Sequence, residues 1–432
     1  MLQDTSIQEN KRALLVSICL SNKEIEKTII SLNELKRLAD TAGYETVDKV
    51  YQNRKNHDRA YFLGKGYIES LRDRMKSEEI EYLIFDDELS PSQHANIEKD
   101  FNIRVLDRTE IILKIFYLHA KTGEARLQIR LAELKYELPR LKQNQITFDR
   151  IAGSSAGGVG FASRGSGEKQ IDLDRTKIRA EIHQISEKLN KILIQKKTQS
   201  KQREKIHRIC LVGYTNAGKS TLFNNLTQSD VLVEDKLFAT LDSTVRPFTR
   251  SIHDDFVIAD TVGFIAKLPH TLVASFRATL KEAKEANLLL HVVDVSDPNF
   301  ESQISEVNTV LKDIETDHIP EFLVFNKIDC LTPDQVLTLS HRFQNAIFIS
   351  AKKDLNVDLL IKKIEDFFIL KIDYHLLIPY REQKLIAQLH KTAVIKEMEH
   401  LENGIRMLVT LDSNYKSQIE NYIINQESTV IE

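Results

Sequence analysis

The residues from Gly213 to Ser220 read G-Y-T-N-A-G-K-S, a pattern that could form the phosphate-binding loop of a nucleoside triphosphatase. Glycines let the backbone curl until several N–H groups point at one phosphate. Lys219 would add a positive charge for the β- and γ-phosphate oxygens, and Ser220 a hydroxyl for Mg²⁺ at the start of a helix. Such a pattern also occurs by chance, but here an apolar stretch (209–212) precedes it and a helical stretch (221–226) follows. The expected nucleotide-binding residues are Gly213, Tyr214, Thr215, Asn216, Ala217, Gly218, Lys219, Ser220 and Thr221.

Three further motifs, each at the end of an apolar stretch, indicate which nucleotide binds. In D-T-V-G, Asp260 is expected to hold the Mg²⁺ shell and Gly263 to offer its N–H to the γ-phosphate. In N-K-I-D, the carboxylate of Asp329 can accept from guanine N1–H and the exocyclic amine together, a pattern that adenine lacks. Lys327 would lie along the base and brace the phosphate loop, and the amides of S-A-K at 350–352 can reach guanine O6. These motifs consist of Asp260, Thr261, Val262, Gly263, Asn326, Lys327, Ile328, Asp329, Ser350, Ala351 and Lys352.

The four motifs in this order predict an enzyme that binds and hydrolyses GTP. A switch loop is expected between the first two, and it would also contact the nucleotide. Thr240 is the candidate for the hydroxyl that meets Mg²⁺ and the γ-phosphate only in the GTP state, with Thr244 as second choice. We therefore predict Lys219, Thr240 and Gly263 as catalytic residues, and Ser220 and Thr240 as Mg²⁺ ligands. The switch loop consists of Phe238, Ala239, Thr240, Leu241 and Asp242.

The residue after Gly263 is Phe264, where Ras-like enzymes have a glutamine that orients water. A phenyl ring neither accepts nor donates a proton, so we expect slow intrinsic hydrolysis that another element or a partner stimulates. Asn216 resembles the asparagine that binds K⁺ in related GTPases without this glutamine. The alternative, an asparagine that only stabilises the turn, stays open.

Composition sets limits on the class of protein. The chain has 432 residues, with 60 Lys and Arg against 63 Asp and Glu, so any nucleic-acid contact must come from local basic faces. Cys19, Cys210 and Cys330 lie far apart without metal or disulfide spacing, which favours a reducing cytoplasm. No signal peptide or apolar run long enough to span a bilayer is visible, although a peripheral membrane association stays open.

The order of predicted elements suggests an α/β protein of four domains. Alternating strand and helix patterns predict a small parallel α/β domain at 1–120, and two long charged helices predict a helical-hairpin arm at 121–205. The P-loop GTPase domain, with a mixed, mostly parallel sheet, is expected at 206–370. A small α/β domain is expected at 371–432, with helices at 382–400 and 414–424 and a strand at 405–411.

A glycine-rich loop at about 152–169 would form the tip of the arm. It is either a passive flexible linker or a recognition tip that approaches RNA phosphates through Arg164, Lys169 and Arg175. In the first domain, Asp86, Asp87 and Asp107 lie at strand ends. Turn residues and helix caps are favoured there over a carboxylate site.

Several of these stretches together resemble the HflX family, in the Obg–HflX group of translational GTPases. They are L-A-E-L to L-P-R-L at 131–141, the G-G-x-G and R-G-x-G-E-x-Q loop, F-A-T-L-D at 238–242, D-T-V-G-F at 260–264, L-P-H at 268–270 and H-V-V-D at 291–294. The resemblance covers nearly the whole chain and implies the same four-domain order. The family loop usually reads R-G-P-G-E-T-Q, whereas this chain has Ser166 and Lys169 in place of the proline and threonine.

The resemblance also implies a partner and a role. Members bind the large ribosomal subunit, and some split stalled ribosomes into subunits, which favours the tip as an rRNA contact. We expect a monomer that splits stalled or idle ribosomes and binds no DNA. The alternatives are a factor that docks on precursor large subunits without splitting, and a GTPase that serves a tRNA-modifying partner.

Overall fold

The computed structural model describes residues 11–141, 164–200, 206–229, 237–238, 244–251, 256–267, 281–368, 371–412 and 419–427. By its internal contacts the chain divides into two units. The first comprises residues 1–249 and 253–353, and the second comprises 250–252 and 354–432. The predicted domain boundaries at 120, 205 and 370 remain predictions.

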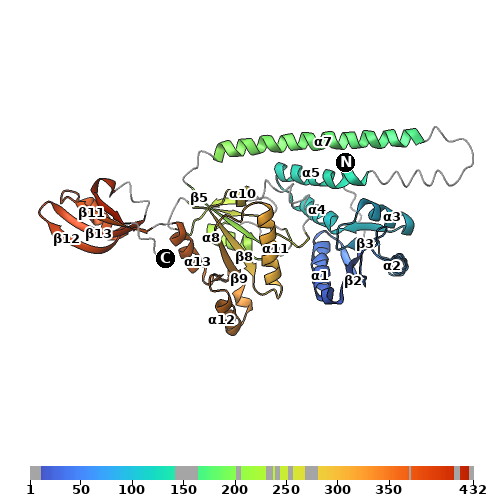
Figure 1. Ribbon diagram of the computed structural model, residues 1–432, viewed down its shortest axis with the longest axis horizontal. Helices are drawn as coiled ribbons and strands as arrows, with labels where there is room; N and C mark the ends of the chain where they lie inside the picture. The colour runs from blue at the N-terminus through green and yellow to red at the C-terminus, as the bar shows by residue number, and fades with distance from the viewer. Residues whose placement is uncertain are drawn as a thin grey trace, which may run out of the picture. The chain divides into compact units, whose positions relative to one another are not determined.

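The described part of the chain begins with a four-stranded parallel sheet in the order β2-β1-β3-β4 (Figure 1). Side chains of alternate orientation give the sheet two apolar faces. Ala13, Leu15 and Ile84 pack with α1 and α4, whereas Leu14, Val16 and Leu83 pack with α2 and α3. The strands are β1 (Arg12–Cys19), β2 (Glu45–Asn53), β3 (Tyr82–Phe85) and β4 (Arg104–Asp107), and the helices are η1 (Asn22–Glu24), α1 (Ile25–Thr41), α2 (Lys65–Ser77), α3 (Pro91–Phe101) and α4 (Arg108–His119).

Asp107 is the N-cap of α4, and its side chain accepts from the backbone N–H of Glu110 in a capping box. This confirms the prediction of a cap there. Asp86 is not a cap: it is fully buried and pairs with Arg108 at 2.9 Å. A buried carboxylate needs such a partner, but Arg108 becomes its neighbour only when the sheet is assembled.

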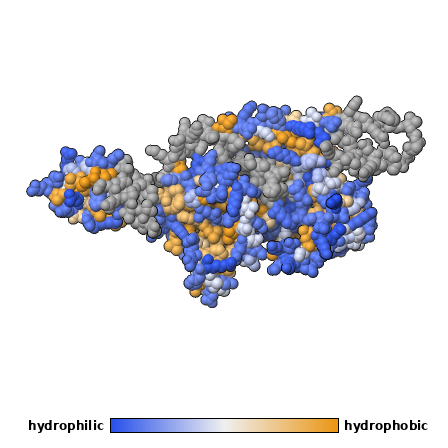
Figure 2. Space-filling model, in the orientation of Figure 1, coloured by the Kyte–Doolittle hydropathy of each residue, from blue (hydrophilic) through white to orange (hydrophobic). Residues whose placement is uncertain are grey.

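Two long helices, α5 (Gly123–Arg140) and α7 (Arg164–Ser200), lie side by side (Figure 1). Leu131 and Leu134 of α5 pack against Ile185 and Leu189 of α7, and Figure 2 shows apolar residues along this line of contact. The helical-hairpin prediction is confirmed. The predicted loop extends too far, however, because residues 164–169 already belong to α7. Gly165 and Gly167 are followed by E-K-Q at 168–170, residues that favour a helix. This stretch continues directly into the helical pattern of the following residues.

The second sheet of the first unit has the strand order β10-β9-β8-β5-β7-β6, and only the β6–β7 pair is antiparallel. Helices α8 and α11 pack against its central strands (Figure 1). This is the mixed, mostly parallel sheet that the sequence predicts. Its elements are β5 (His207–Gly213), α8 (Lys219–Thr227), β6 (Thr244–Pro247), β7 (Phe256–Asp260), α10 (Lys281–Lys284), β8 (Leu288–Asp294), α11 (Phe300–Asp313), β9 (Glu321–Asn326), η4 (Ile328–Cys330), α12 (Pro333–Arg342) and β10 (Ile347–Phe348).

The second unit contains α13 (Val357–Phe368) and an antiparallel sheet in the order β12-β13-β11-β14. The helix predicted at 382–400 is wrong beyond residue 392, because 394–401 form an edge strand. Of the helix predicted at 414–424, residues 419–424 are described. A short 3-10 helix at 420–422 leads into a strand there, so the prediction is wrong from residue 423. The elements are β11 (Lys371–Ile378), α14 (Gln383–Thr392), β12 (Val394–Leu401), β13 (Gly404–Asp412), η6 (Glu420–Tyr422) and β14 (Ile423–Glu427).

Candidate functional site

The predicted motifs meet at one edge of the second sheet. Strands β5, β7, β8, β9 and β10 are parallel, so their carboxyl ends lie on the same side. The G-x-x-x-x-G-K-S loop follows β5, D-T-V-G begins at the end of β7, N-K-I-D begins at the end of β9, and S-A-K follows β10. The edge therefore gathers loops from residues 213 to 352.

The loop after β5 depends on two glycines in the left-handed region. Gly213 has φ +146° and Gly218 has φ +91°. A Cβ on Gly218 would lie 2.2 Å from Nδ2 of Asn326. The ammonium of Lys219 donates to the carbonyls of Gly213 and Tyr214, at 3.2 and 2.7 Å. Burial lowers the pKa of Lys219 to about 8, although Asp260 opposes the shift.

The D-T-V-G segment lies directly against this loop. Ser220 donates to Asp260 at 2.7 Å, and Asp260 is fully buried. The backbone N–H of Thr215 donates to the carbonyl of Phe264 at 2.7 Å, and a Cβ on Gly263 would lie 2.8 Å from Cα of Thr215. The segment thus has no room for a side chain at position 263.

The side chains of two residues in this segment contact the protein interior, and nucleotide binding by these residues remains a prediction. The hydroxyl of Thr261 donates to the carbonyl of Leu211 at 2.7 Å, so it fastens β7 to β5. The side chain of Val262 is buried in the apolar core.

Asn326 joins three of the motifs. Its Nδ2 donates to the carbonyl of Ala217 at 2.9 Å, and its Oδ1 accepts from the N–H of Ala351 at 2.9 Å. Lys327 donates to the carbonyl of Asn216 at 2.9 Å and to Asp294 at 2.6 Å. Lys327 therefore braces the loop as its sequence position suggests. Asp294 was not predicted as a site residue, although its position at the end of an apolar strand is a usable signal.

Asp329 lies beside the third loop. A hydrogen bond from Ser350 lowers the pKa of Asp329, and Lys353, 3.4 Å away, supports the shift. The carboxylate is therefore ionised at neutral pH and can accept two hydrogen bonds. Ile328 is half-buried, Ser350 and Ala351 are buried, and Lys352 is exposed.

Part of the predicted site lies outside the described residues, namely Ala239, Thr240, Leu241 and Asp242. Phe238 is described, and its ring contacts that of Phe116 of α4 with centroids 4.6 Å apart. In the arm, the side chains of Arg164 and Lys169 are not described, and Arg175 is half-buried.

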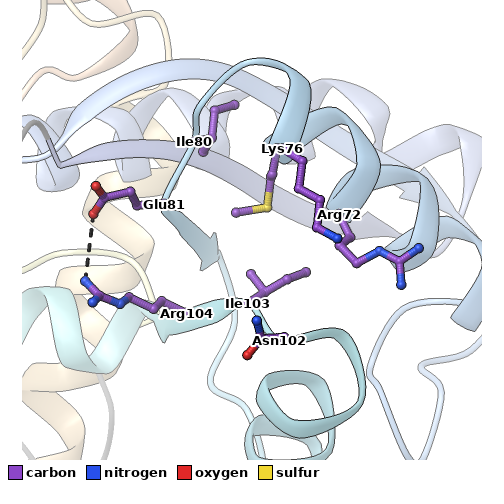
Figure 3. Close-up of a pocket in the computed structure, with 8 residues that line it drawn as sticks. Arg72, Lys76, Ile80, Glu81, Asn102, Ile103 and Arg104 are labelled. Atoms are coloured by element: carbon purple, nitrogen blue, oxygen red, sulfur yellow. Dashed lines mark ion pairs between the residues drawn. The ribbon is translucent and has the colours of Figure 1, made fainter.

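A separate cavity of about 350 Å³ lies in the first sheet, at the amino ends of β3 and β4. Figure 3 shows Arg72 and Lys76 of α2 on one side and the Glu81–Arg104 ion pair, 3.8 Å long, on another. It contains none of the predicted nucleotide-binding residues. In the described parts of the chain, no helix is both long and apolar enough to cross a membrane.

Three family models match consecutive parts of the chain. "GTP-binding GTPase N-terminal" matches residues 30–117, "GTP-binding GTPase Middle Region" matches 119–203, and "50S ribosome-binding GTPase" matches 208–327.

Curated relatives match over most of their length. The chain is 39% identical over 421 residues to "GTPase HflX" of Caldanaerobacter subterraneus subsp. tengcongensis, covering 97% of this chain and 95% of the relative. It is 36% identical over 399 residues to "GTPase HflX" of Escherichia coli K12, covering 91% and 92%. Among solved structures, a GTP-binding protein from Sulfolobus solfataricus in complex with GDP is 27% identical, with a TM-score of 0.43 and coverage of 82% of this chain and 97% of that one.

Proposed function

The chain belongs to the HflX family of GTPases, which hydrolyse GTP, and we propose that it binds the large ribosomal subunit and splits stalled or idle ribosomes in its GTP state. The observation that carries the proposal is a continuous series of contacts from the nucleotide loops to the arm. A splitting factor needs such a connection, because the nucleotide must control the part that reaches the ribosome.

In the proposed site, the backbone of Gly213–Thr221 binds the phosphates, and the carboxylate of Asp329 accepts hydrogen bonds from the guanine base. Mg²⁺ fits the residues present, since Ser220 and Asp260 place a hydroxyl and a carboxylate oxygen within 2.7 Å of each other. Mg²⁺ prefers oxygen ligands and takes one or two from the protein, with water and phosphate for the rest. When bound, it would neutralise phosphate charge. Thr240 and the rest of 238–242 would complete the site in the GTP state.

The first part of the connection joins the nucleotide loops to the first sheet. Buried side chains form one apolar core that includes Ile112 and Phe116 of α4 together with Phe238 and Phe264. A change in the loops after Gly263 or around Phe238 must therefore repack against α4, because close-packed cores transmit displacement.

The second part joins the first sheet to the arm. Tyr136 and Arg140 of α5 donate to the buried carboxylate of Asp107 at 2.7 and 3.0 Å, and Arg140 also donates to the carbonyl of Leu89. These bonds fix α5, and α7 packs on α5. In our proposal the tip of the arm then contacts rRNA, with Arg164, Lys169 and Arg175 at phosphates.

The surroundings of Phe264 support slow intrinsic hydrolysis, which in our proposal the ribosome stimulates. Phe264 is only 2% exposed and belongs to the apolar core, so it does not orient a water molecule. K⁺ bound through Asn216 would supply positive charge near the phosphates.

We therefore predict faster hydrolysis in KCl than in NaCl, and Asn216→Asp should change that ratio. The measurement is phosphate release at equal ionic strength in the two salts. Equal rates in both salts for the natural chain would contradict the K⁺ proposal.

The test of the main proposal is sedimentation of 70S-type ribosomes in sucrose gradients with the protein and GTP, a non-hydrolysable GTP analogue or GDP. We expect separated subunits with GTP and with the analogue, and intact ribosomes with GDP. Intact ribosomes in all three would overturn splitting. Co-sedimentation with precursor large subunits, with mature ribosomes left whole, would instead support the assembly-factor alternative.

A further inference from the structure

Residues of the first sheet and its helices also form hydrogen bonds with the nucleotide loops. The first of these contacts is made by Tyr214 of the phosphate-binding loop. Its hydroxyl donates to Glu34 of α1 and accepts from the backbone N–H of Ala266 at 2.6 Å. Tyr214 is only 8% exposed. One buried hydroxyl therefore links three segments, namely the phosphate-binding loop, the loop after Gly263 and helix α1 beside the first sheet.

Lys267, at the end of the described loop, forms the second link. Its ammonium donates to Asp86 and Asp87, both at 2.6 Å. Burial alone would lower the pKa of Lys267, but the two carboxylates outweigh it and raise that pKa above its ordinary value. A cavity of about 220 Å³ admits water beside Asp87, whereas the Asp86 side chain is fully buried. Asp86 is therefore the less screened and stronger of the two partners.

Arg108 connects the two links. Its guanidinium donates to Glu34 and to Asp86, the latter at 2.9 Å, and it is only 1% exposed. Asp86 also accepts from Ser31 of α1 at 2.6 Å. A guanidinium paired with two carboxyl groups fixes the direction of both, because its planar fork accepts few geometries. Glu34 and Asp86 thus face the nucleotide loops in a set arrangement.

The loop that these residues hold is the one expected to present Gly263 to the γ-phosphate. Phe264 bonds through its backbone to Gly213 and Thr215, at 3.1 and 2.7 Å. Lys267 lies four residues beyond Gly263, so its position limits where the Gly263 N–H can point. Small displacements of such groups reduce hydrolysis strongly, because catalysis of phosphoryl transfer depends almost entirely on positioning and electrostatics.

We propose that Asp86, Arg108 and Glu34 are positioning residues for GTP hydrolysis, which hold Lys267 and Tyr214 so that the 263–267 loop is ordered before the reaction. The proposal rests on the nucleotide site proposed above. It makes the first sheet part of the hydrolytic machinery without any contact to the nucleotide. A partner that shifts the first sheet would change the rate of hydrolysis through this cluster.

The experiment is single-turnover GTP hydrolysis by the full chain in excess, with separate measurement of GTP and GDP affinity. Lys267→Met should lower the hydrolysis rate about tenfold while both dissociation constants stay within about twofold, because only the ordering of the loop is lost. Lys267→Arg should stay within about threefold of the natural rate, since a guanidinium also pairs with two carboxylates.

Lys284→Met is the matched control. Lys284 is 38% exposed against 40% for Lys267, and it pairs with Glu315 at 4.0 Å, away from the loops. The Lys284→Met variant should hydrolyse GTP at the natural rate.

A double variant tests the pairing. Asp87→Asn combined with Lys267→Met should be no slower than Lys267→Met alone, because the two side chains act as one pair.

An unchanged or raised rate in Lys267→Met, with GTP binding intact, would overturn the positioning proposal, as would equal losses in Lys267→Met and Lys284→Met. Failure of the natural chain to bind GTP would instead count against the nucleotide site itself. If Lys267→Met does not fold, Asp86→Asn, which removes the charge of the stronger partner, decides the question with Lys267→Arg as comparison. A slower rate in Asp86→Asn with GTP binding intact supports the proposal, and an unchanged rate overturns it.

Discussion

Replacing Asp329 by Asn should lower the affinity for GTP roughly a thousandfold, because a site built to pair with a polar group discriminates strongly once that pairing is lost. The carboxylate accepts from two guanine donors. An amide would place its own N–H₂ group opposite the exocyclic amine, so two donors would face each other. Xanthine has an oxygen at that position, and Asp329→Asn should therefore bind XTP better than GTP.

The measurement is calorimetric titration of the natural chain and the variant with GTP, XTP and ATP. Asp334→Asn is the matched control, since Asp334 lies in the first turn of the neighbouring helix α12 and no part of the proposed site uses it. Its three affinities should equal those of the natural chain. An Asp329→Asn variant with an unchanged preference for GTP would show that another group reads the base.

Gly218→Ala should weaken GTP binding about 100-fold, the second-largest effect expected here. A left-handed conformation costs an alanine about 1–2 kcal/mol. The new methyl would also displace Nδ2 of Asn326, and losing its hydrogen bond to Ala217 adds about 1–3 kcal/mol. Asn326 also holds the loop after β10, so the base-binding side of the site would loosen as well.

Gly66→Ala provides the comparison, because Gly66 lies within α2 and a Cβ there would meet nothing within 4 Å. An alanine favours a helix over glycine by about 0.5–1 kcal/mol, so this variant should unfold at the same or higher urea concentration and bind GTP normally. Tight GTP binding by Gly218→Ala would mean that the loop adopts a different conformation around the nucleotide.

The sequence was sufficient to predict the fold class and the edge where the motifs meet, because both follow from local patterns. An apolar strand followed by a short polar motif is readable without tertiary structure, as in β5 with its glycine loop and β9 with N-K-I-D. The prediction that Lys327 braces the phosphate loop also follows from strand order, since β9 and β5 end at the same edge.

The contacts of the first sheet with the nucleotide loops were not predictable in this way. Asp86 and Lys267 are 181 positions apart, and Tyr214 occupies a variable position of its motif. Asp86 resembles any turn residue until Arg108 and Lys267 are placed beside it. The strand at 394–401 was missed for a similar reason, because its pairing with β13 outweighs a local pattern that is compatible with a helix.

The most direct test of the whole account is competition for bound GTP in the full chain with Mg²⁺. A labelled GTP analogue is bound first, and unlabelled GTP, GDP or ATP is then added at increasing concentration. We predict displacement by GTP and GDP at similar low concentrations and no displacement by a hundredfold excess of ATP. Displacement by ATP as readily as by GTP would contradict a guanine-reading edge formed by the loops after β5, β7, β9 and β10.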